Sequence, residues 1–400
     1  MIKKIYIPVL ALVFLAMMSV SCIYPFTPES EDGSGALVIE GDILIGKETV
    51  ISVSRTAPIS DPDGYKAPPA GKVWVENDAG AVFNGVEDPK TPGRYTVDTR
   101  SADTSPNYCL HFLDSESGKE YVSAWERVCS APVIDSLSYN LDYDRSKLNI
   151  ALSMHALKES YFKWSYVEDW EYHSLYYSQI KFIPIYDYVH GIRTIVDGRI
   201  EKRDYYDNIY ACYKHGESTQ IMTFSTENQT DDRFVDLEFL PISRDDFRIS
   251  YLYKITVDLE PLTKDAYLYW ENIKGNSEYN GNLFAPNPSE LVGNIRCLQE
   301  PDEMVMGYVN VAQIARKDLV VSHLKANFYM SSEPVSETAS VLLDKSQYVT
   351  YFVKEEYLPY NYYMFPGNVN ETYWAPARCV DCKLLGGTYE RPEGWPPVED

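Results

Sequence analysis

The sequence predicts a mostly β fold, in which an N-terminal β-sandwich precedes a larger β-rich domain with one or two helices. Short apolar runs are separated by Gly, Pro and Asp along most of the chain, which is typical of antiparallel strands. Only one stretch stands out with the three- and four-residue spacing of an amphipathic helix. The chain has 400 residues, 45% of them hydrophobic and 14% aromatic, which is enough apolar material for a packed core.

Residues 1–21 are predicted to be a lipoprotein signal peptide. Lys3 and Lys4 precede an apolar run from Ile5 to Val20, and this run is too short to span a bilayer. Small residues then lead to Cys22, the position at which a lipoprotein is cleaved and acylated. We therefore expect Cys22 to carry the lipid and to begin the mature chain. The alternative is an ordinary signal peptide followed by a chance cysteine.

Residues 22–35 are predicted to form an acidic, flexible tether. The segment contains Glu29, Glu31 and Asp32 among Pro, Ser and Gly, and it has no Lys or Arg. Such a composition cannot bury enough apolar surface to order itself. The tether would hold a folded body away from a membrane.

Residues 36–130 are predicted to form the β-sandwich. Their apolar runs are only three to five residues long, and turn residues such as Pro92 and Gly93 separate them. The expected strands lie at Leu37–Ile39, Ile43–Ile45, Val50–Val53, Lys72–Glu76, Ala81–Phe83, Arg94–Val97, Tyr108–Phe112 and Glu120–Ser123.

Residues 131–400 are predicted to form the larger β-rich domain, with a boundary at Pro132. Apolar and polar residues alternate along Leu148–Met154. Phe162–Tyr166 places aromatic and polar side chains on opposite faces, which indicates a sheet with one face exposed to solvent. A helix is expected over 263–274, with Thr263 as its N-cap and Gly275 just beyond its end. Further strands are expected at Met304–Val311 and Asp318–Val321.

Six cysteines besides Cys22 are disulfide candidates, because export would place them in an oxidising compartment. Cys109 and Cys129 flank a hairpin-like stretch and could bridge neighbouring strands. Cys379 and Cys382 form a C-x-x-C motif, for which a redox pair or a metal site are the alternatives. Lys383 onwards reads as strand and turn, which does not favour a redox site. The candidates are Cys109, Cys129, Cys212, Cys297, Cys379 and Cys382.

The charge and the motifs exclude several classes of function. The formal net charge of −23 argues against a nucleic-acid partner, because binding to phosphates requires Lys and Arg. The chain lacks nucleotide-binding and hydrolase motifs, and its acidic pairs lack the pattern of a calcium loop. We therefore expect no catalytic residue, no metal and no cofactor.

An aromatic-rich region between Trp164 and Tyr213 is the candidate for ligand or partner binding. Rigid aromatic rings suit stacking on sugar rings or docking of a protein partner. The alternative is that strands of a large β protein simply use Tyr and Trp for packing. The residues chosen as candidates are Trp164, Tyr166, Trp170 and Tyr172.

Two resemblances give these features a context. Pro92–Tyr95 and Gly118–Tyr121 resemble the immunoglobulin-like, transthyretin-type modules that accompany carboxypeptidases and outer-membrane receptors. The mature chain also resembles a family of outer-membrane lipoproteins of Bacteroidota whose function is unknown and whose genes often lie beside TonB-dependent receptors. The stretches that carry this second resemblance are Leu37–Gly41, Tyr161–Trp170, Tyr267–Trp270, Gly281–Phe284, Pro288–Ser289, Gly293–Ile295, Met306–Tyr308, Cys379–Lys383, Gly386–Gly387, Pro392 and Trp395.

The resemblance implies a lipid-anchored protein of the outer membrane that carries out no catalysis. We expect it to act as an accessory of a TonB-dependent transport system, with the receptor and a glycan or peptide as its partners. The acyl chains on Cys22 would hold it in the outer membrane, facing either the periplasm or the exterior. The alternative is a structural or adhesive envelope lipoprotein, and an enzyme is a more distant one.

Overall fold

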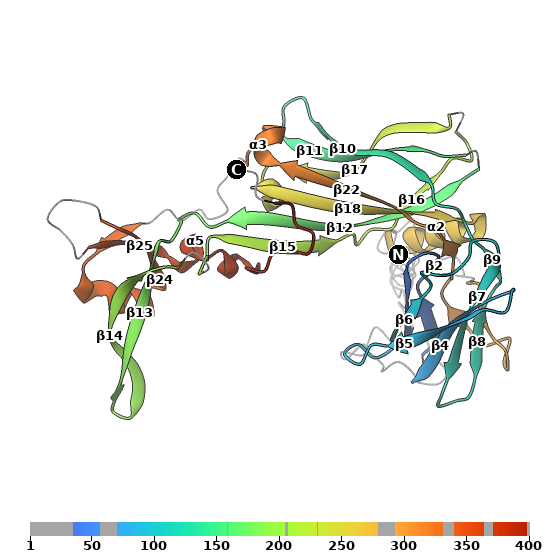
Figure 1. The fold of residues 1–400 in the computed structure, drawn as a ribbon, viewed down its shortest axis with the longest axis horizontal. Coiled ribbons are helices and arrows are strands. Elements are labelled where there is room, and N and C mark those ends of the chain that lie inside the picture. The colour runs from blue at the N-terminus through green and yellow to red at the C-terminus, as the bar shows by residue number, and fades with distance from the viewer. Residues whose placement is uncertain are drawn as a thin grey trace, which may run out of the picture.

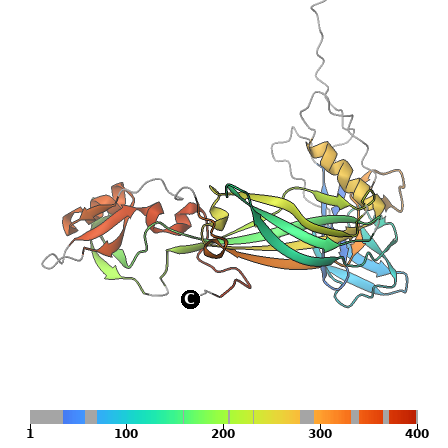
Figure 2. The same cartoon turned by 90° about the horizontal axis from the view of Figure 1, so that it is seen from above.

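The structure is a computed structural model that describes residues 35–56, 70–157, 159–204, 207–229, 231–278, 293–330, 340–363 and 371–397. These residues form a long body of three β-rich parts (Figures 1 and 2). The predicted signal peptide, Cys22 and nearly all of the tether lie outside the described residues, as do Gly281–Phe284 and Pro288–Ser289. Across the described ranges, no helix is both long and apolar enough to cross a membrane.

The first part is one ten-stranded sheet that curls around a core of aliphatic and aromatic side chains. Alternate residues of its strands are buried, which is why short alternating runs revealed them. The strand order is β19-β8-β7-β4-β5-β6-β3-β1-β20, and β9 pairs with β7. The strands are β1 (Leu37–Glu40), β3 (Glu48–Arg55), β4 (Gly71–Asn77), β5 (Val82–Glu87), β6 (Arg94–Asp98), β7 (Asn107–Asp114), β8 (Glu120–Ser123), β9 (Glu126–Arg127), β19 (Ile295–Cys297) and β20 (Val305–Met306).

The N-terminal sheet differs from the sandwich predicted within 36–130, because residues far along the chain complete it. β19 pairs with β8, and β20 pairs in parallel with β1. A second parallel pair joins β2 (Ile43–Leu44) to β21 (Val311–Ala312). The expected single strand Met304–Val311 is therefore two short strands, separated at Gly307, where φ is +131°. The predicted boundary at residue 130 does not enclose a complete unit.

The second part is a sandwich of two antiparallel sheets, which confirms the mostly β class. Aliphatic residues of β11, such as Ile150 and Leu152, pack against Ile255 and Val257 of β18. One sheet has the order β10-β11-β17, and the other has β15-β12-β18-β22 with β16 on β12. The strands are β10 (Val133–Leu141), β11 (Lys147–His155), β12 (Tyr161–His173), β15 (Ala211–Glu217), β16 (Met222–Ser225), β17 (Arg233–Ser243), β18 (Leu252–Leu262) and β22 (Ala315–Ser322).

Helix α2 (Lys264–Glu278) covers part of this sandwich near the N-terminal sheet (Figure 1). The amide of Ala266 donates a hydrogen bond to Thr263 Oγ1 at 3.2 Å, which confirms Thr263 as the N-cap. Ala266 and Tyr269 are buried against Tyr161. The predicted end at residue 274 is wrong, since the helix continues through Gly275 to Glu278. Gly275 is a helix-interior residue and not the glycine that ends the helix.

The third part lies at the opposite end of the body from the N-terminal sheet (Figure 1). The chain leaves the central sandwich after β12, makes a long hairpin and returns in β15. Residues from near the C-terminus pack on the base of that hairpin, around Phe182, Tyr348 and Trp374. Its elements are β13 (Ile180–Val189), β14 (Ile192–Lys202), β23 (Val341–Leu343), η2 (Lys345–Gln347), α4 (Tyr348–Lys354), β24 (Tyr357–Tyr362), β25 (Thr372–Pro376), α5 (Ala377–Val380) and η3 (Cys382–Leu385).

Two short elements complete the described fold. η1 (Phe247–Ile249) precedes β18, and α3 (His323–Ala326) follows β22. The side chain of Asp246 caps η1 by accepting a hydrogen bond from the amide of Arg248. With these turns, the described residues contain more helical segments than the one or two expected.

Candidate functional site

The four aromatic candidates on β12 belong to the packed interior. Trp164, Tyr166 and Trp170 are partly buried between the two sheets, where the Trp164 ring contacts Phe224 and Phe239. Tyr172 is 1% exposed, and its hydroxyl donates a hydrogen bond to the carbonyl of Cys382 at 2.9 Å. Trp164, Tyr166 and Trp170 each keep a partly exposed surface, whereas Tyr172 offers almost none to a ligand. Their position matches the packing role that strand aromatics commonly have.

One disulfide joins the central sandwich to the C-terminal part, between Cys212 of β15 and Cys382 of η3. Cys382 is therefore not paired with Cys379 in a C-x-x-C disulfide, and Cys379 is buried beside Ile209 and Val380. The residues after Cys382 form a 3₁₀ helix capped by the Asp381 side chain, and not the strand expected there.

The suggested bridge between Cys109 and Cys129 is absent, because both side chains are free thiols in the structure. Cys297 is also a free thiol. The Cys109 thiol is buried and donates a hydrogen bond to the carbonyl of Ser123 at 3.1 Å. Cys129 lies in the linker after β9, where an isolated bridge pairs it with Ala312. The Cys109 thiol thus bonds to a carbonyl of β8, whereas Cys129 is fixed through its main chain.

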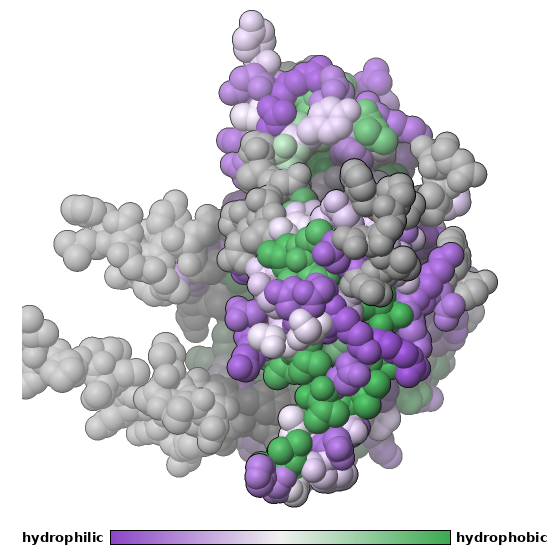
Figure 3. All heavy atoms as spheres, turned by 90° about the vertical axis from the view of Figure 1, so that its left-hand side faces the viewer, coloured by the Kyte–Doolittle hydropathy of each residue, from purple (hydrophilic) through white to green (hydrophobic). Residues whose placement is uncertain are grey.

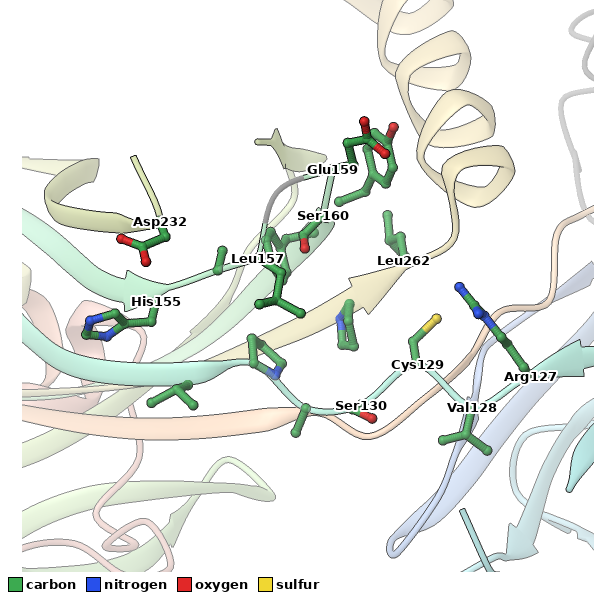
Figure 4. A pocket seen from close by; sticks show the side chains of 17 residues that line it. Arg127, Val128, Cys129, Ser130, His155, Leu157, Glu159, Ser160, Asp232 and Leu262 are labelled. Carbon is green, nitrogen blue, oxygen red and sulfur yellow. The ribbon is translucent and has the colours of Figure 1, made fainter. Parts of the chain in front are cut away.

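A cavity of about 740 Å³ lies where the N-terminal sheet meets the central sandwich (Figure 4). Figure 4 shows Cys129 and Ser130 on the linker side and Leu157, Ser160 and Leu262 on the sandwich side. The predicted boundary residue, Pro132, lies within this linker. The lining residues are Arg127–Val133, His155–Leu157, Glu159–Phe162, Asp232, Pro261 and Leu262.

The rim of the cavity exposes aliphatic side chains to solvent. Val133 is 61% exposed and Leu157 is 81% exposed. Charged groups lie around them: Arg127, Glu159 and Asp232 also line the cavity. A hollow with apolar walls and a few polar groups is the usual form of a site for a small ligand.

The linker wall of the cavity is held in place by main-chain hydrogen bonds. The amide of Cys129 donates to the carbonyl of Val311 at 2.8 Å, and the amide of Gln313 donates to the carbonyl of Cys129 at 2.9 Å. Burial raises the pKa of the Cys129 thiol to about 11. The thiol therefore stays protonated near neutral pH and is a poor nucleophile.

A buried ionic cluster involves Lys163 and Glu260, which adjoin the cavity residues Phe162 and Pro261 in the sequence. Lys163 Nζ is 2.7 Å from Asp42 Oδ2 and 3.1 Å from Glu260 Oε2. The side-chain amide of Asn310 donates to Glu260 Oε1 at 2.8 Å. The Lys163 ammonium also lies over the ring of Trp270, 4.3 Å from its centroid. The cluster thus joins residues of the N-terminal sheet, the central sandwich and α2.

The charges of this cluster shift each other's proton affinity. Burial, followed by the nearby carboxylate of Asp42, raises the pKa of Glu260 to about 7. Burial alone would lower the pKa of Lys163, but the carboxylates of Asp42 and Glu260 outweigh it and raise that pKa. Lys163 is therefore the cation that neutralises the cluster. The face of Phe162–Tyr166 that was expected to be exposed to solvent is covered by α2 at Lys163.

Sequence reasoning missed the cavity and the cluster because both are assembled from distant segments. Pro132, Leu157 and Leu262 become neighbours only after folding. The one local sign of the ionic cluster was Lys163, a polar residue between Phe162 and Trp164. A strand with a solvent-exposed lysine has the same alternation of polar and aromatic residues, so the sequence did not distinguish the two. Among the described residues, no three His, Cys, Asp or Glu side chains are grouped as a metal site requires.

Comparison with known families places the chain in a family of unknown function, which agrees with that part of the resemblance. A family model described as a domain of unknown function (DUF4249) matches residues 23–318. No curated protein matches the chain. Two solved structures align with the chain, both at low TM-scores.

The first of these solved structures combines a manganese lipoxygenase of Gaeumannomyces graminis with part of a zonadhesin of Komagataella pastoris. It is 12% identical, covers 59% of this chain and 91% of its own, and has a TM-score of 0.16. A domain of a biofilm-associated protein is 9% identical, covers 77% of this chain and 64% of its own, and has a TM-score of 0.12. The family match spans more than half of the sequence, and the chain therefore belongs to the DUF4249 family, whose function is unknown.

Proposed function

We propose that this chain is a lipid-anchored protein of the bacterial outer membrane that binds a ligand for a TonB-dependent transport system, without catalysis. Its lipid anchor would be Cys22, and residues 22–35 would be the tether. The family match begins at residue 23, directly after that cysteine, which agrees with the expected start of the mature chain. The association with Bacteroidota and with TonB-dependent receptors rests on the family resemblance.

The observation that carries the binding role is the cavity beside Pro132. Its volume of about 740 Å³ falls within the range of roughly 300–1,000 Å³ that is usual for ligand sites. The exposed side chains of Val133 and Leu157 at its rim would lose contact with water when a ligand binds. Arg127, Glu159 and Asp232 could orient polar groups of the ligand. A short peptide or an oligosaccharide combines these apolar and polar features.

Binding fits the groups around the cavity better than a reaction does. The thiol of Cys129 is held protonated by burial. A protonated thiol is not an activated nucleophile, and the described residues group no three His, Cys, Asp or Glu side chains as a metal site requires. These observations support a protein that holds its ligand unchanged.

The test is ligand binding by a variant in which the cavity is filled. Ala131→Trp would place an indole at the exposed linker wall, and Ala79→Trp would place one in an exposed turn of the N-terminal sheet as the control. A glycan and peptide panel is screened by the rise in thermal unfolding temperature that a bound ligand causes. We expect at least one ligand that stabilises the wild type and Ala79→Trp but not Ala131→Trp.

The transport role is tested by affinity purification of the acylated protein from detergent-solubilised outer membranes. A TonB-dependent receptor should be recovered with it. Failure to recover any receptor, together with no stabilising ligand in the panel, would contradict the proposal. Recovery of envelope components without a receptor would favour the structural or adhesive alternative.

A further inference from the structure

The hairpin of β13 and β14 has a packed base and an outer half that extends into solvent. Ile180 and Phe182 at the base are buried, and the Phe182 ring lies 5.6 Å from that of Trp374 between centroids. Gly198 lies so close to the Phe182 ring that a Cβ there would clash with it. From Ile185 outward, nearly every residue of β13 and β14 is exposed until Gly198. Among the described residues, no third strand pairs with either strand.

The hairpin ends in a tight turn that keeps its two strands in fixed register. His190 and Gly191 both have positive φ, +52° and +80°, as the common two-residue hairpin turn requires. Val189 then lies opposite Ile192, and Tyr188 opposite Arg193. The outer half is therefore a defined structure and not a loose loop.

Apolar side chains occupy both faces of this outer half. Val189 and Ile192 share one face, while Tyr186, Tyr188 and Ile195 lie on the other. Tyr188 is 72% exposed and Ile192 is 69% exposed. Figure 3 looks at this end of the molecule and shows hydrophobic side chains gathered on its lower half, the level of the hairpin in Figure 1. Contiguous apolar exposure of this kind marks an interaction surface.

The arrangement on two faces distinguishes between possible occupants. A flat protein surface would cover one face and leave the other in water. The boundary region of a lipid bilayer surrounds an inserted tip and removes both faces from water. Tyrosine is enriched at that boundary, and Arg193, whose guanidinium lies 4.1 Å from the centroid of the Tyr186 ring, can extend its charge to the headgroups.

The charge of the tip does not oppose such an insertion. Asp187 and Arg193 are the only side chains of fixed charge between Ile185 and Val196, and their charges cancel. This neutral tip contrasts with a chain whose formal net charge is −23. Binding would therefore depend on apolar burial and not on attraction to anionic lipids.

The position of the expected anchor brings a bilayer within reach. Residues 22–35 span at most about 50 Å when fully extended, and they lie just before β1 of the N-terminal sheet in the sequence. Figure 1 shows the N-terminal sheet and the hairpin projecting from the same side of the central sandwich, at opposite ends of the body. We propose that the tip of the β13–β14 hairpin inserts into the surface of the membrane that holds Cys22. This inference rests on the anchor in the proposed function.

The test places a photo-crosslinking residue at the tip of the acylated, full-length protein. Tyr188→p-benzoylphenylalanine is compared with the same replacement at Tyr143, a fully exposed tyrosine in the turn between β10 and β11. Figure 1 shows that β10 and β11 lie on the side of the body away from the hairpin. Both proteins are reconstituted in vesicles of phosphatidylethanolamine and phosphatidylcholine and irradiated. We expect about tenfold more lipid adduct from position 188 than from position 143.

The adduct yield tests the insertion of the tip, and the palmitate content of Cys22 tests the lipid anchor independently. Equal adduct yields at both positions would overturn the insertion of the tip. Adducts from position 188 to a protein in native outer membranes, without adducts to lipid, would also overturn it and would assign the tip to a protein partner. Palmitate on Cys22 is measured on the same samples, and its absence would contradict the proposed anchor whatever the adduct yields.

Discussion

The ammonium nitrogen of Lys163 lies 2.7 Å from a carboxylate oxygen of Asp42, and this ion pair joins the central sandwich to the N-terminal sheet. Glu260 approaches the same ammonium at 3.1 Å. A buried pair of this kind adds little net stability compared with apolar residues, but removal of one partner leaves a charge without compensation. The cluster therefore makes the contact between the two parts sensitive to Lys163.

Lys163→Met should lower the free energy of unfolding by about 3–5 kcal/mol, because Asp42 and Glu260 would remain buried without a cation. Chemical denaturation followed by circular dichroism measures the change. The matched control is Lys264→Met, which removes an exposed ion pair with Glu227 at 2.7 Å and should change stability little. Equal effects of the two substitutions would show that the buried cluster does not hold the parts together.

The raised pKa of Glu260 predicts how stability changes with pH. The folded state holds the proton up to a pKa of about 7, whereas the unfolded chain releases it near 4.5. The stabilisation from this group is thus complete below pH 4.5 and is lost as pH rises through about 7.

Glu260→Gln should remove this part of the pH dependence, because glutamine keeps a neutral side chain of the same shape. Unfolding midpoints measured between about pH 5 and pH 8 should fall more steeply for the wild type than for the variant. A wild type whose stability rises relative to the variant over this range would contradict the assignment of a proton to Glu260.

The disulfide predicts which cysteines are linked and how much stability is lost when the link is removed. Peptide mapping under non-reducing conditions should find Cys212 linked to Cys382, and a Cys379–Cys382 link would contradict the structure. The two residues are 170 positions apart, so the bond closes a long loop of the unfolded chain. Replacement of both by serine should cost about 2–5 kcal/mol of unfolding free energy, measured by thermal or chemical denaturation.

Strand positions could be predicted because a strand leaves a local pattern. Val50–Val53 and Leu148–Met154 alternate within a few residues, and each lies in an observed strand. The end of α2 could not be read in this way, since Gly275 is tolerated in a helix whose stability comes from packing. The cavity beside Pro132 and the partners of Lys163 were inaccessible to sequence reasoning, because they depend on contacts between distant segments.

Strands within residues 293–312 pair with the N-terminal sheet, and this pairing predicts the effect of a substitution at Gly307. Its φ is +131°, and a Cβ there would lie 2.0 Å from the carbonyl oxygen of Ile39 on β1. Gly307→Ala should therefore push β20 away from β1 and lower the thermal unfolding temperature by several degrees. Differential scanning calorimetry measures the shift.

Gly275→Ala is the matched control, because a Cβ there meets no atom within 4 Å in the described part of the chain, apart from the backbone of its own helix. Alanine should stabilise α2 by up to about 1 kcal/mol, so the two substitutions are expected to act in opposite directions. If Gly307→Ala were as harmless as Gly275→Ala, β20 would not be seated against β1. The parallel pairing of β20 with β1 would then be wrong, and β19 would be the strand from beyond residue 130 that extends the sheet, through its pairing with β8.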